Sequence, residues 1–312
     1  MLPIFRTGQS IPSIGFGTWQ VPTDKVANLV KDAVDVGYKH IDCAFVYRNE
    51  YNLGHEYFST LKTRDQLFIT SKLWSTYHEP HRVSKGLEKT LSDLCLDYLD
   101  LYLVHNPIRC DPSASNLFGS QYFKREWLVE TWRSMEKLYE SGKCKAIGVS
   151  NFSTTKLQWL MDEATIVPHV NQVELHPYLP QNKLVKFCRE NQIQLVAYSP
   201  LGSPGSQSQD FGKPTAPVLL NDPIVNEIAS RNNATPAQVL IAWSIQREIP
   251  VLVKSSSKSR IVENLAATKI TLPQSDMDTL SPMKTQCRYL DFDLFLTEGK
   301  TVDDYWDGEL FN

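Results

Sequence analysis

The sequence predicts an α/β fold in which a parallel sheet closes into a (β/α)8 barrel. Short runs of β-branched and aromatic residues alternate along the chain with longer amphipathic stretches, which is the pattern of strand–helix units on a parallel sheet. Eight such units can be counted in the 312 residues, and eight is the number that closes a barrel of about 250 residues. We therefore expect a TIM barrel with an N-terminal β-hairpin, extra helices and a C-terminal tail loop.

The predicted strands are short, apolar and rich in residues that favour extended backbone. In chain order they are Ser13–Thr18, His40–Asp42, Leu67–Lys72, Leu99–His105, Ala146–Ser150, His169–Glu174, Leu195–Ser199 and Val251–Lys254. The predicted helices span residues 24–36, 50–60, 80–94, 126–141, 153–163, 181–190, 236–247 and 258–267. Polar residues that favour a helix N-cap precede three of them, namely Thr23 or Asp24, Ser153 and Thr235.

Three segments lie outside the repeat. Residues 1–12 contain the turn-like Thr7-Gly8-Gln9 and predict a hairpin that covers the N-terminal end of the barrel. Residues 202–217 are rich in Gly, Ser, Pro and Gln, which indicates a long loop, and an extra helix is expected at 222–232. The tail, 285–312, is strongly aromatic. No linker divides the chain, so we expect a single domain over 1–312.

Composition excludes several functional classes. Hydrophobic residues make up 42% of the chain and the net charge is −3, which indicates a globular protein and gives no sign of a nucleic-acid partner. The N-terminus lacks the pattern of a signal peptide, and no apolar run is long enough for a membrane span, so a cytoplasmic protein is expected. The six cysteines lack paired spacing, which predicts reduced thiols.

Polar residues close the predicted strands, and in a parallel barrel the active site lies at these carboxyl ends. Asp42, Lys72 and His105 close three successive strands, with Tyr47 in the loop after the first. A phenol is a weak acid at neutral pH unless a nearby cation stabilises its phenolate, and Lys72 is suited to that role. Asp42 would keep the lysine charged. His105 would then hold a substrate carbonyl close to Tyr47.

Each of these residues also has a structural interpretation when taken alone. A single histidine such as His105 is more often structural than catalytic, and Asp42 could cap a helix. Their occurrence at successive strand ends favours a site over separate structural roles.

A second group of polar residues suits a nicotinamide. Ser150, Asn151 and Gln172 offer both donors and acceptors, as a carboxamide requires, and Tyr198 offers a flat ring for stacking. Lys254, Ser255 and Arg260 could bind phosphate, although residues 254–258 could equally form only a solvated loop that leads into a helix.

Other known ligand-binding and catalytic motifs are incomplete or absent in the sequence. The segment Gly15–Gln20 lacks the third glycine of the dinucleotide fingerprint, and His78–His81 is too short for the helical zinc motif. Neither a Walker loop nor a nucleophile elbow occurs, and no metal is expected.

Ordered motifs across nearly the whole chain resemble the aldo-keto reductase family, close to its aldose reductase and aldehyde reductase branch. They are GFGTWQ at 15–20, GYKHIDCAFVYRNE at 37–50, ITSKLW at 69–74, YLVHNP at 102–107, TWRSMEKLYESGKCKAIGVSNF at 131–152, VNQVELHPY at 170–178 and AYSPLGS at 197–203. The resemblance implies a catalytic tetrad of Asp42, Tyr47, Lys72 and His105, with NADPH/NADP+ as cofactor.

The resemblance also implies contacts for each part of the cofactor. Thr18, Trp19 and Asp42 are expected beside it; Ser150, Asn151 and Gln172 hold the carboxamide; and Tyr198 stacks on the ring. The pyrophosphate follows Ser199, Leu201 and Ser203. The adenosine and its 2′-phosphate meet Lys254, Ser255, Arg260, Glu263 and Asn264, which favours NADP(H) over NAD(H).

The implied substrate wall comprises Trp19, Val46, Tyr47, Trp74, His105, Asn106 and Phe118. Asn106 stands where this branch usually has tryptophan, so a smaller and more polar wall is expected there. Val253 replaces a common proline, and the loops at 108–125 and 204–220 and the aromatic tail from about 285 match poorly. Because such segments shape substrate choice in the family, the substrate stays open.

Three functions follow as hypotheses. The first is NADPH-dependent reduction of aldehydes or ketones, aldoses included, to alcohols with Tyr47 as proton donor in a monomeric enzyme. The second is oxidoreduction of steroid, prostaglandin or other lipid carbonyls, which the same tetrad permits. The third is a cofactor-binding structural protein or channel-auxiliary subunit on the same scaffold.

Overall fold

The alternating apolar segments form eight parallel strands that close into a barrel, as predicted from the sequence. The computed structural model describes residues 1–113, 120–121, 124–202, 215–281, 283–296 and 299–311. Around the barrel the strands follow chain order, and β12 pairs with β3 to close it. The strands are β3 (Ile14–Gly17), β4 (His40–Asp42), β5 (Phe68–Leu73), β6 (Leu101–Val104), β9 (Ile147–Ser150), β10 (Val170–Glu174), β11 (Gln194–Tyr198) and β12 (Val251–Val253).

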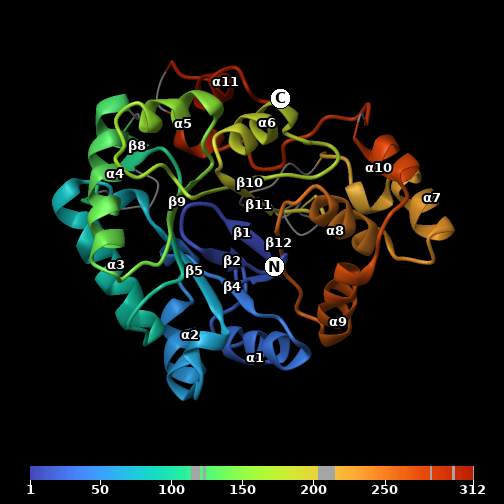
Figure 1. Cartoon of the computed structure of the whole chain (residues 1–312), viewed down its shortest axis with the longest axis horizontal. Coiled ribbons are helices and arrows are strands. Elements are labelled where there is room, and N and C mark those ends of the chain that lie inside the picture. The colour runs from blue at the N-terminus through green and yellow to red at the C-terminus, as the bar shows by residue number, and fades with distance from the viewer. Residues whose placement is uncertain (114–119, 122–123, 203–214, 282, 297–298, 312) are drawn as a thin grey trace.

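Helices cover the outside of the barrel (Figure 1). They are α1 (Val26–Val36), α2 (Glu50–Glu56), α3 (Pro80–Leu94), α4 (Arg125–Glu140), α5 (Thr154–Met161), α6 (Asn182–Glu190), α7 (Pro223–Arg231), α8 (Pro236–Gln246) and α9 (Lys258–Ala266). With helices outside and side chains inside, every residue of β4, β5, β6, β9 and β10 is buried, which is why these strands read as continuous apolar runs.

Two of the predicted helix caps form and one does not. Ser153 accepts a hydrogen bond from the backbone N–H of Lys156, and Thr235 forms a capping box with Gln238. The cap expected at Thr23 or Asp24 is wrong: α1 has Lys25 as its N-cap and no side-chain cap. The carbonyl of Pro22 accepts the backbone N–H groups of residues 25 and 26, so a backbone turn starts this helix instead.

The N-terminal hairpin closes one end of the barrel, as expected. Strands β1 (Leu2–Ile4) and β2 (Gln9–Ile11) pair antiparallel and lie across the middle of the ring of helices in Figure 1. Ile4 and Ile11 are fully buried against the interior of the barrel, in a cluster that includes Phe68 and Leu252. Burying each isoleucine contributes about 1.5–3 kcal/mol, so the hairpin seals the barrel floor and leaves the opposite end for a site.

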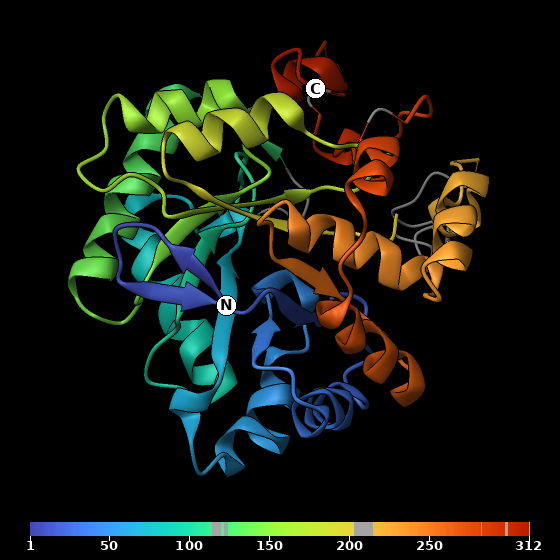
Figure 2. The same ribbon diagram turned by 45° about the vertical axis from the view of Figure 1, so that its right-hand side comes forward.

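The segments outside the repeat contain more regular structure than the sequence indicated. The extra helix is α7, as predicted, and a small sheet pairs β7 (Arg109–Cys110) with β8 (Ser120–Gln121). Two helices were not expected: α10 (Gln274–Leu280) and, within the predicted tail loop, α11 (Val302–Trp306). In Figure 2 the tail, in red, lies beside α6 on the upper side of the barrel.

Within the described segments no helix is long and apolar enough to cross a membrane.

Candidate active site

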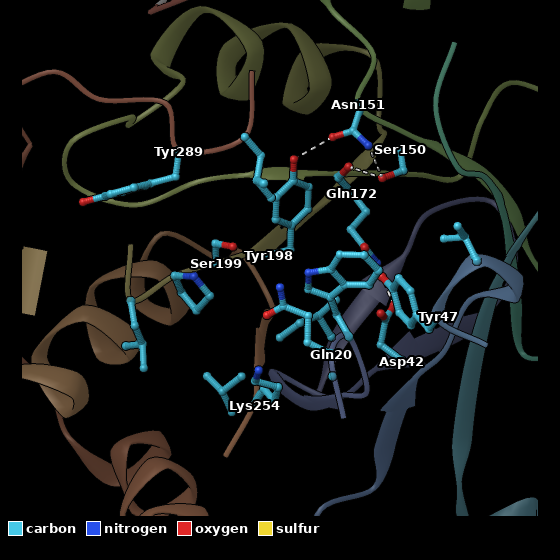
Figure 3. Close-up of a pocket in the computed structure, with 18 of the residues that line it drawn as sticks. Gln20, Asp42, Tyr47, Ser150, Asn151, Gln172, Tyr198, Ser199, Lys254 and Tyr289 are labelled. Carbon is cyan, nitrogen blue, oxygen red and sulfur yellow. Dashed lines mark hydrogen bonds between the residues drawn. The ribbon is translucent and has the colours of Figure 1, made fainter. Parts of the chain in front are cut away.

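A cavity of about 610 Å³ opens at the carboxyl ends of the barrel strands. Figure 3 shows side chains from several strand ends converging on it. The sequence-predicted residues that line it are Trp19, Asp42, Val46, Tyr47, Trp74, His105, Ser150, Asn151, Gln172, Tyr198, Ser199, Leu201, Lys254, Ser255, Arg260, Glu263 and Asn264. Barrel closure therefore brings together residues that are more than 200 positions apart in the chain.

A buried ion pair between Asp42 and Lys72 lies at the base of this cavity. Lys72 Nζ is 2.5 Å from Asp42 Oδ1, and the two side chains are 0% and 4% exposed. The neighbouring strands β4 and β5 present both residues at the same barrel end. The ammonium also donates to the Cys43 carbonyl at 2.9 Å. Burial by itself lowers the pKa of Lys72, but Asp42 and Tyr47 raise it by more than burial lowers it. The net result is a raised pKa and a charged lysine.

Tyr47 lies on a short 3-10 turn, Phe45–Tyr47, directly after β4. The Lys72 ammonium donates its third hydrogen bond to the Tyr47 phenol oxygen, at 3.0 Å. Because this oxygen acts as an acceptor, its own O–H remains available to donate to a ligand. Burial raises the pKa of Tyr47 to about 12, and the nearby ammonium opposes that rise. The phenol is thus protonated at neutral pH, and Lys72 is placed to stabilise the phenolate.

His105 follows β6 and lies between two aromatic rings. Its ring meets Tyr47 edge-on at 5.8 Å between centroids and Trp74 at 5.3 Å. Burial, together with the charge of Lys72, holds the pKa of His105 well below its usual range. The imidazole is therefore neutral, with one N–H donor and one acceptor nitrogen. Its Nδ1 has no hydrogen-bond partner in the part of the chain that the structure describes.

Amide and hydroxyl side chains at the end of β9 and in β10 connect to Asp42 and His105. Gln172 Nε2 donates to Asp42 Oδ2 at 2.9 Å, so the second carboxylate oxygen is also bound. The Ser150 hydroxyl donates to the Gln172 carbonyl, and the Asn151 amide donates to the His105 carbonyl at 2.9 Å. The three polar side chains and the ion pair thus form one hydrogen-bonded network, of which Figure 3 shows Asp42, Ser150, Asn151 and Gln172.

Tyr198 stands over the cavity with its hydroxyl anchored. The hydroxyl donates to Asn151 Oδ1 at 2.8 Å, which holds the ring in place at the cavity wall (Figure 3). Asn151 and Ser199 both adopt left-handed backbone, with φ of 65° and 49°. For a non-glycine residue this conformation costs about 1–3 kcal/mol and is concentrated at functional sites. Both strained residues stand at strand ends and present polar groups to the cavity.

Cationic side chains occur at the end of the cavity remote from Asn151, where Figure 3 shows Lys254. Lys254 and Arg260 line the cavity, and among the described residues neither has a carboxylate within ion-pair distance. Burial lowers the pKa of Lys254. Glu263 is engaged elsewhere, since its carboxylate accepts from the Thr235 hydroxyl at 2.6 Å. Two cations that no described carboxylate neutralises favour an anionic ligand group in this cavity.

Apart from Lys72, which is buried behind Tyr47, two described residues of the predicted site do not line the cavity. Thr18 is fully buried and donates its hydroxyl to the Asp42 carbonyl at 2.9 Å. Asn106 is likewise fully buried, and its Oδ1 accepts from the Ser75 hydroxyl at 2.8 Å and from the Ile108 N–H at 3.1 Å. Asn106 therefore braces the loop after β6 and does not form the polar substrate wall that the sequence predicted. Phe118 and Ser203 lie outside the described residues.

The C-terminal tail, which the sequence placed among the segments that shape substrate choice, contributes a wall of the cavity, although none of its residues was assigned individually. Residues 289–295 all line the cavity. Phe292 and Phe295 belong to an apolar cluster with Trp74, and the rings of Phe295 and Trp74 lie 6.0 Å apart. The abundance of aromatic residues in the tail indicated burial, and the family resemblance indicated a part in substrate choice, but no local pattern indicated which tail residues meet the cavity.

The arrangement combines a protonated phenol, a supporting ammonium and a neutral imidazole beside an apolar wall. Such a set can donate a proton to a carbonyl oxygen and stabilise the negative charge that develops on it. Across the described residues no group of three or more His, Cys, Asp or Glu side chains could hold a metal ion.

Comparison with known proteins agrees with this chemistry. The model of the Aldo/keto reductase family matches residues 13–283. An aldo/keto reductase of Synechocystis sp. is 43% identical over 309 residues, which cover 96% of this chain and 94% of that protein. Aldo-keto reductase family 1 member A1 of Bos taurus is 38% identical over 308 residues (96% and 94%), and that of Gallus gallus is 40% identical over 305 residues (95% and 92%). The chain belongs to the aldo/keto reductase family.

Proposed function

We propose that the protein reduces aldehydes and ketones to alcohols with NADPH, and that Tyr47 donates the proton. The observation that carries this proposal is the contact between the Lys72 ammonium and the Tyr47 phenol oxygen, 3.0 Å long, at the base of a cavity also lined by His105. A phenol that accepts from a fixed ammonium keeps its proton for the ligand and has a stabilised conjugate base. Both properties are required of an acid that protonates a carbonyl oxygen.

The cavity fits a dissociable nicotinamide dinucleotide. Ser150, Asn151 and Gln172 would hold the carboxamide, beside the flat face of Tyr198. Ser199 and Leu201 would follow the pyrophosphate, and the exposed Lys254 and Arg260 would meet phosphate at the far end. When bound, the reduced nicotinamide supplies a hydride for the carbonyl carbon.

The side chains of the protein bind the carbonyl, donate the proton and stabilise the resulting phenolate. His105 hydrogen-bonds the carbonyl oxygen of the substrate and holds it near Tyr47. Tyr47 donates its proton to that oxygen as negative charge develops, and Lys72 stabilises the phenolate that remains. Asp42 and Gln172 hold the ammonium in place through the buried network. The proton is restored to Tyr47 from solvent after the product leaves.

The substrate end of the cavity favours an uncharged carbonyl compound with an apolar body. Trp19, Trp74, Phe292 and Phe295 offer ring surfaces, and Val46 adds an aliphatic one. Apolar surface of this kind is recognised by burial, which contributes about 25 cal/mol per Å². No feature of the described residues favours the lipid-carbonyl alternative or a non-catalytic role over this assignment.

An NADPH oxidation assay tests the proposal directly. Benzaldehyde and propanal should each cause an enzyme-dependent loss of NADPH absorbance. One molecule of alcohol should appear for each NADPH consumed. Failure to oxidise NADPH with either aldehyde or with a simple ketone, in a preparation that binds NADPH, would remove the proposed activity.

Replacing Arg260 with alanine should raise the KM for NADPH by about 10-fold or more, since a charge-assisted contact to phosphate contributes about 1.5–3 kcal/mol. The KM for NADH, which lacks the 2′-phosphate, should change little. Lys258→Ala is the matched control, because Lys258 pairs with Asp32 at 2.7 Å and does not line the cavity. Equal effects of Arg260→Ala on the two cofactors would contradict a 2′-phosphate contact at Arg260.

We further propose that the chain acts as one domain and as a monomer in the cytoplasm. All six cysteines are free thiols in the structure, which suits a reducing compartment.

A further inference from the structure

The cavity wall formed by the C-terminal tail is anchored at its start by Glu174. This carboxylate is completely buried at the end of β10. It accepts the backbone N–H groups of Tyr289 at 2.7 Å and of Leu290 at 2.8 Å, together with His176 Nε2 at 2.9 Å. Glu174 is the last residue of a strand that the sequence predicted, but it does not line the cavity. Its hydrogen bonds instead hold the first residues of the wall.

A second anchor holds the tail beyond α11. The Asp307 carboxylate accepts from the Ser153 hydroxyl and from Lys156 Nζ, the latter being 0% exposed. Lys156 Nζ also donates to the Tyr305 carbonyl at 2.6 Å. One carboxylate of the tail, that of Asp307, and one carbonyl, that of Tyr305, therefore bind the Lys156 ammonium, which has no access to water.

Glu309 extends this second anchor. Its carboxylate accepts the backbone N–H of Thr154 at 2.9 Å and also the Thr154 hydroxyl. Lys183, from α6, lies 2.9 Å from the same carboxylate. The two acids of the tail thus bind the start of α5 and the side of α6, the helix beside which the tail runs in Figure 2.

Aromatic packing connects the two anchors to the cavity wall. The rings of Phe292 and Tyr305 stack at 5.3 Å between centroids with an interplanar angle of 6°. Trp306 lies under the buried guanidinium of Arg288, 3.7 Å from the ring centroid. Because α11 packs on residues of the wall, a shift of α11 would move Phe292, which lines the cavity.

Both anchors arise from the strand ends that carry the polar network. Glu174 stands two residues after Gln172, and Ser153 stands two residues after Asn151. The wall on the substrate side is therefore fastened to the same two strands that present amides to the cavity.

We propose that Glu174, Lys156, Asp307 and Glu309 are positioning residues that determine selectivity for large carbonyl substrates by fixing the tail wall. This proposal rests on the proposed function. A small aldehyde needs only the base of the cavity, whereas a large one is held by Phe292 and Phe295. Loosening an anchor should therefore weaken binding of large substrates and leave the chemical step unchanged.

The test compares Asp307→Asn and Glu309→Gln with the matched control Asp303→Asn. Asp303 carries the same charge on the exposed side of α11, and among the described residues its side chain makes no hydrogen bond or ion pair. Both anchor variants should raise the KM for 2-naphthaldehyde about tenfold, the size expected when a charge-assisted hydrogen bond is weakened. The kcat for propanal and the KM for NADPH should match those of the control. Glu174→Gln should give the same pattern from the other end of the wall.

Amide hydrogen exchange provides a readout that does not need activity. In the anchor variants, peptides from 289–296 and 299–311 should exchange faster than in Asp303→Asn, while barrel peptides stay unchanged. If the wild type reduces no aldehyde, the proposed function fails, but the exchange data still show whether the anchors hold the tail in place. Unchanged exchange in the tail, or equal losses with propanal and 2-naphthaldehyde, would overturn the proposal.

Discussion

Replacing Tyr47 with phenylalanine should reduce kcat for aldehyde reduction by at least about 10²–10⁴-fold, the usual contribution of a positioned acid. The phenol oxygen receives a hydrogen bond from Lys72 and retains its own proton for the ligand. Phenylalanine preserves the ring, including its edge-on contact with His105, but removes the proton. Binding of NADPH, measured by fluorescence titration, should therefore stay close to that of the wild type.

Tyr51→Phe is the matched control, since it removes the hydroxyl of a tyrosine that is 58% exposed on α2 and stacks on His55. This variant should keep full activity. Near-normal turnover by Tyr47→Phe would show that another group supplies the proton, and the assignment of the acid would have to be abandoned.

Replacing Lys72 with methionine should affect stability and catalysis together. The substitution leaves the Asp42 carboxylate buried without its cation, and breaking a buried pair in this way costs about 3–5 kcal/mol of unfolding free energy. It also removes the ammonium that stabilises the Tyr47 phenolate, so turnover should fall to near zero. Urea denaturation followed by tryptophan fluorescence measures the first effect, and the NADPH assay measures the second.

Two comparisons separate these effects. Lys31→Met removes the cation of an ion pair of the same length, 2.5 Å, whose side chains are 57% and 51% exposed, so it should change stability little. The double variant Lys72→Met with Asp42→Leu leaves no unpaired charge and should recover much of the lost stability without recovering turnover. If Lys72→Met alone were as stable as the wild type, the Asp42 carboxylate would not depend on Lys72 for its stability in the folded protein.

Most of the architecture could be predicted from local patterns. Apolar strands of the right length alternate with amphipathic helices, and the eight strands observed fall within two residues of their predicted ends. The hairpin was predicted from the turn-like Thr7-Gly8-Gln9 and from the need to cover the N-terminal end of the barrel. The first-helix cap was wrong because the backbone of Pro22 competes with the side chains of Thr23 and Asp24, and composition does not reveal that competition.

The site was only partly predictable. Residues at strand ends must converge when a parallel sheet closes, so Asp42, Lys72 and His105 could be grouped before any distance was known. Asn106 follows His105 directly and was assigned to the same wall, yet Ser75 and Ile108 hold its amide within the protein. One residue beyond a strand end, the direction of a side chain depends on the fold of the loop.

The sequence by itself determined the barrel, its sealed floor and the identity of the polar residues at the open end. These depend on the spacing of apolar residues, which is a local property. The tertiary structure decided that Lys72 uses its three hydrogen bonds on Asp42, Cys43 and Tyr47, which leaves the phenol with a proton to donate. It also decided that the tail closes the substrate side, through anchors such as Glu174 and Tyr289, 115 residues apart. Contacts over such separations depend on how side chains meet across the closed barrel, and no local pattern encodes them.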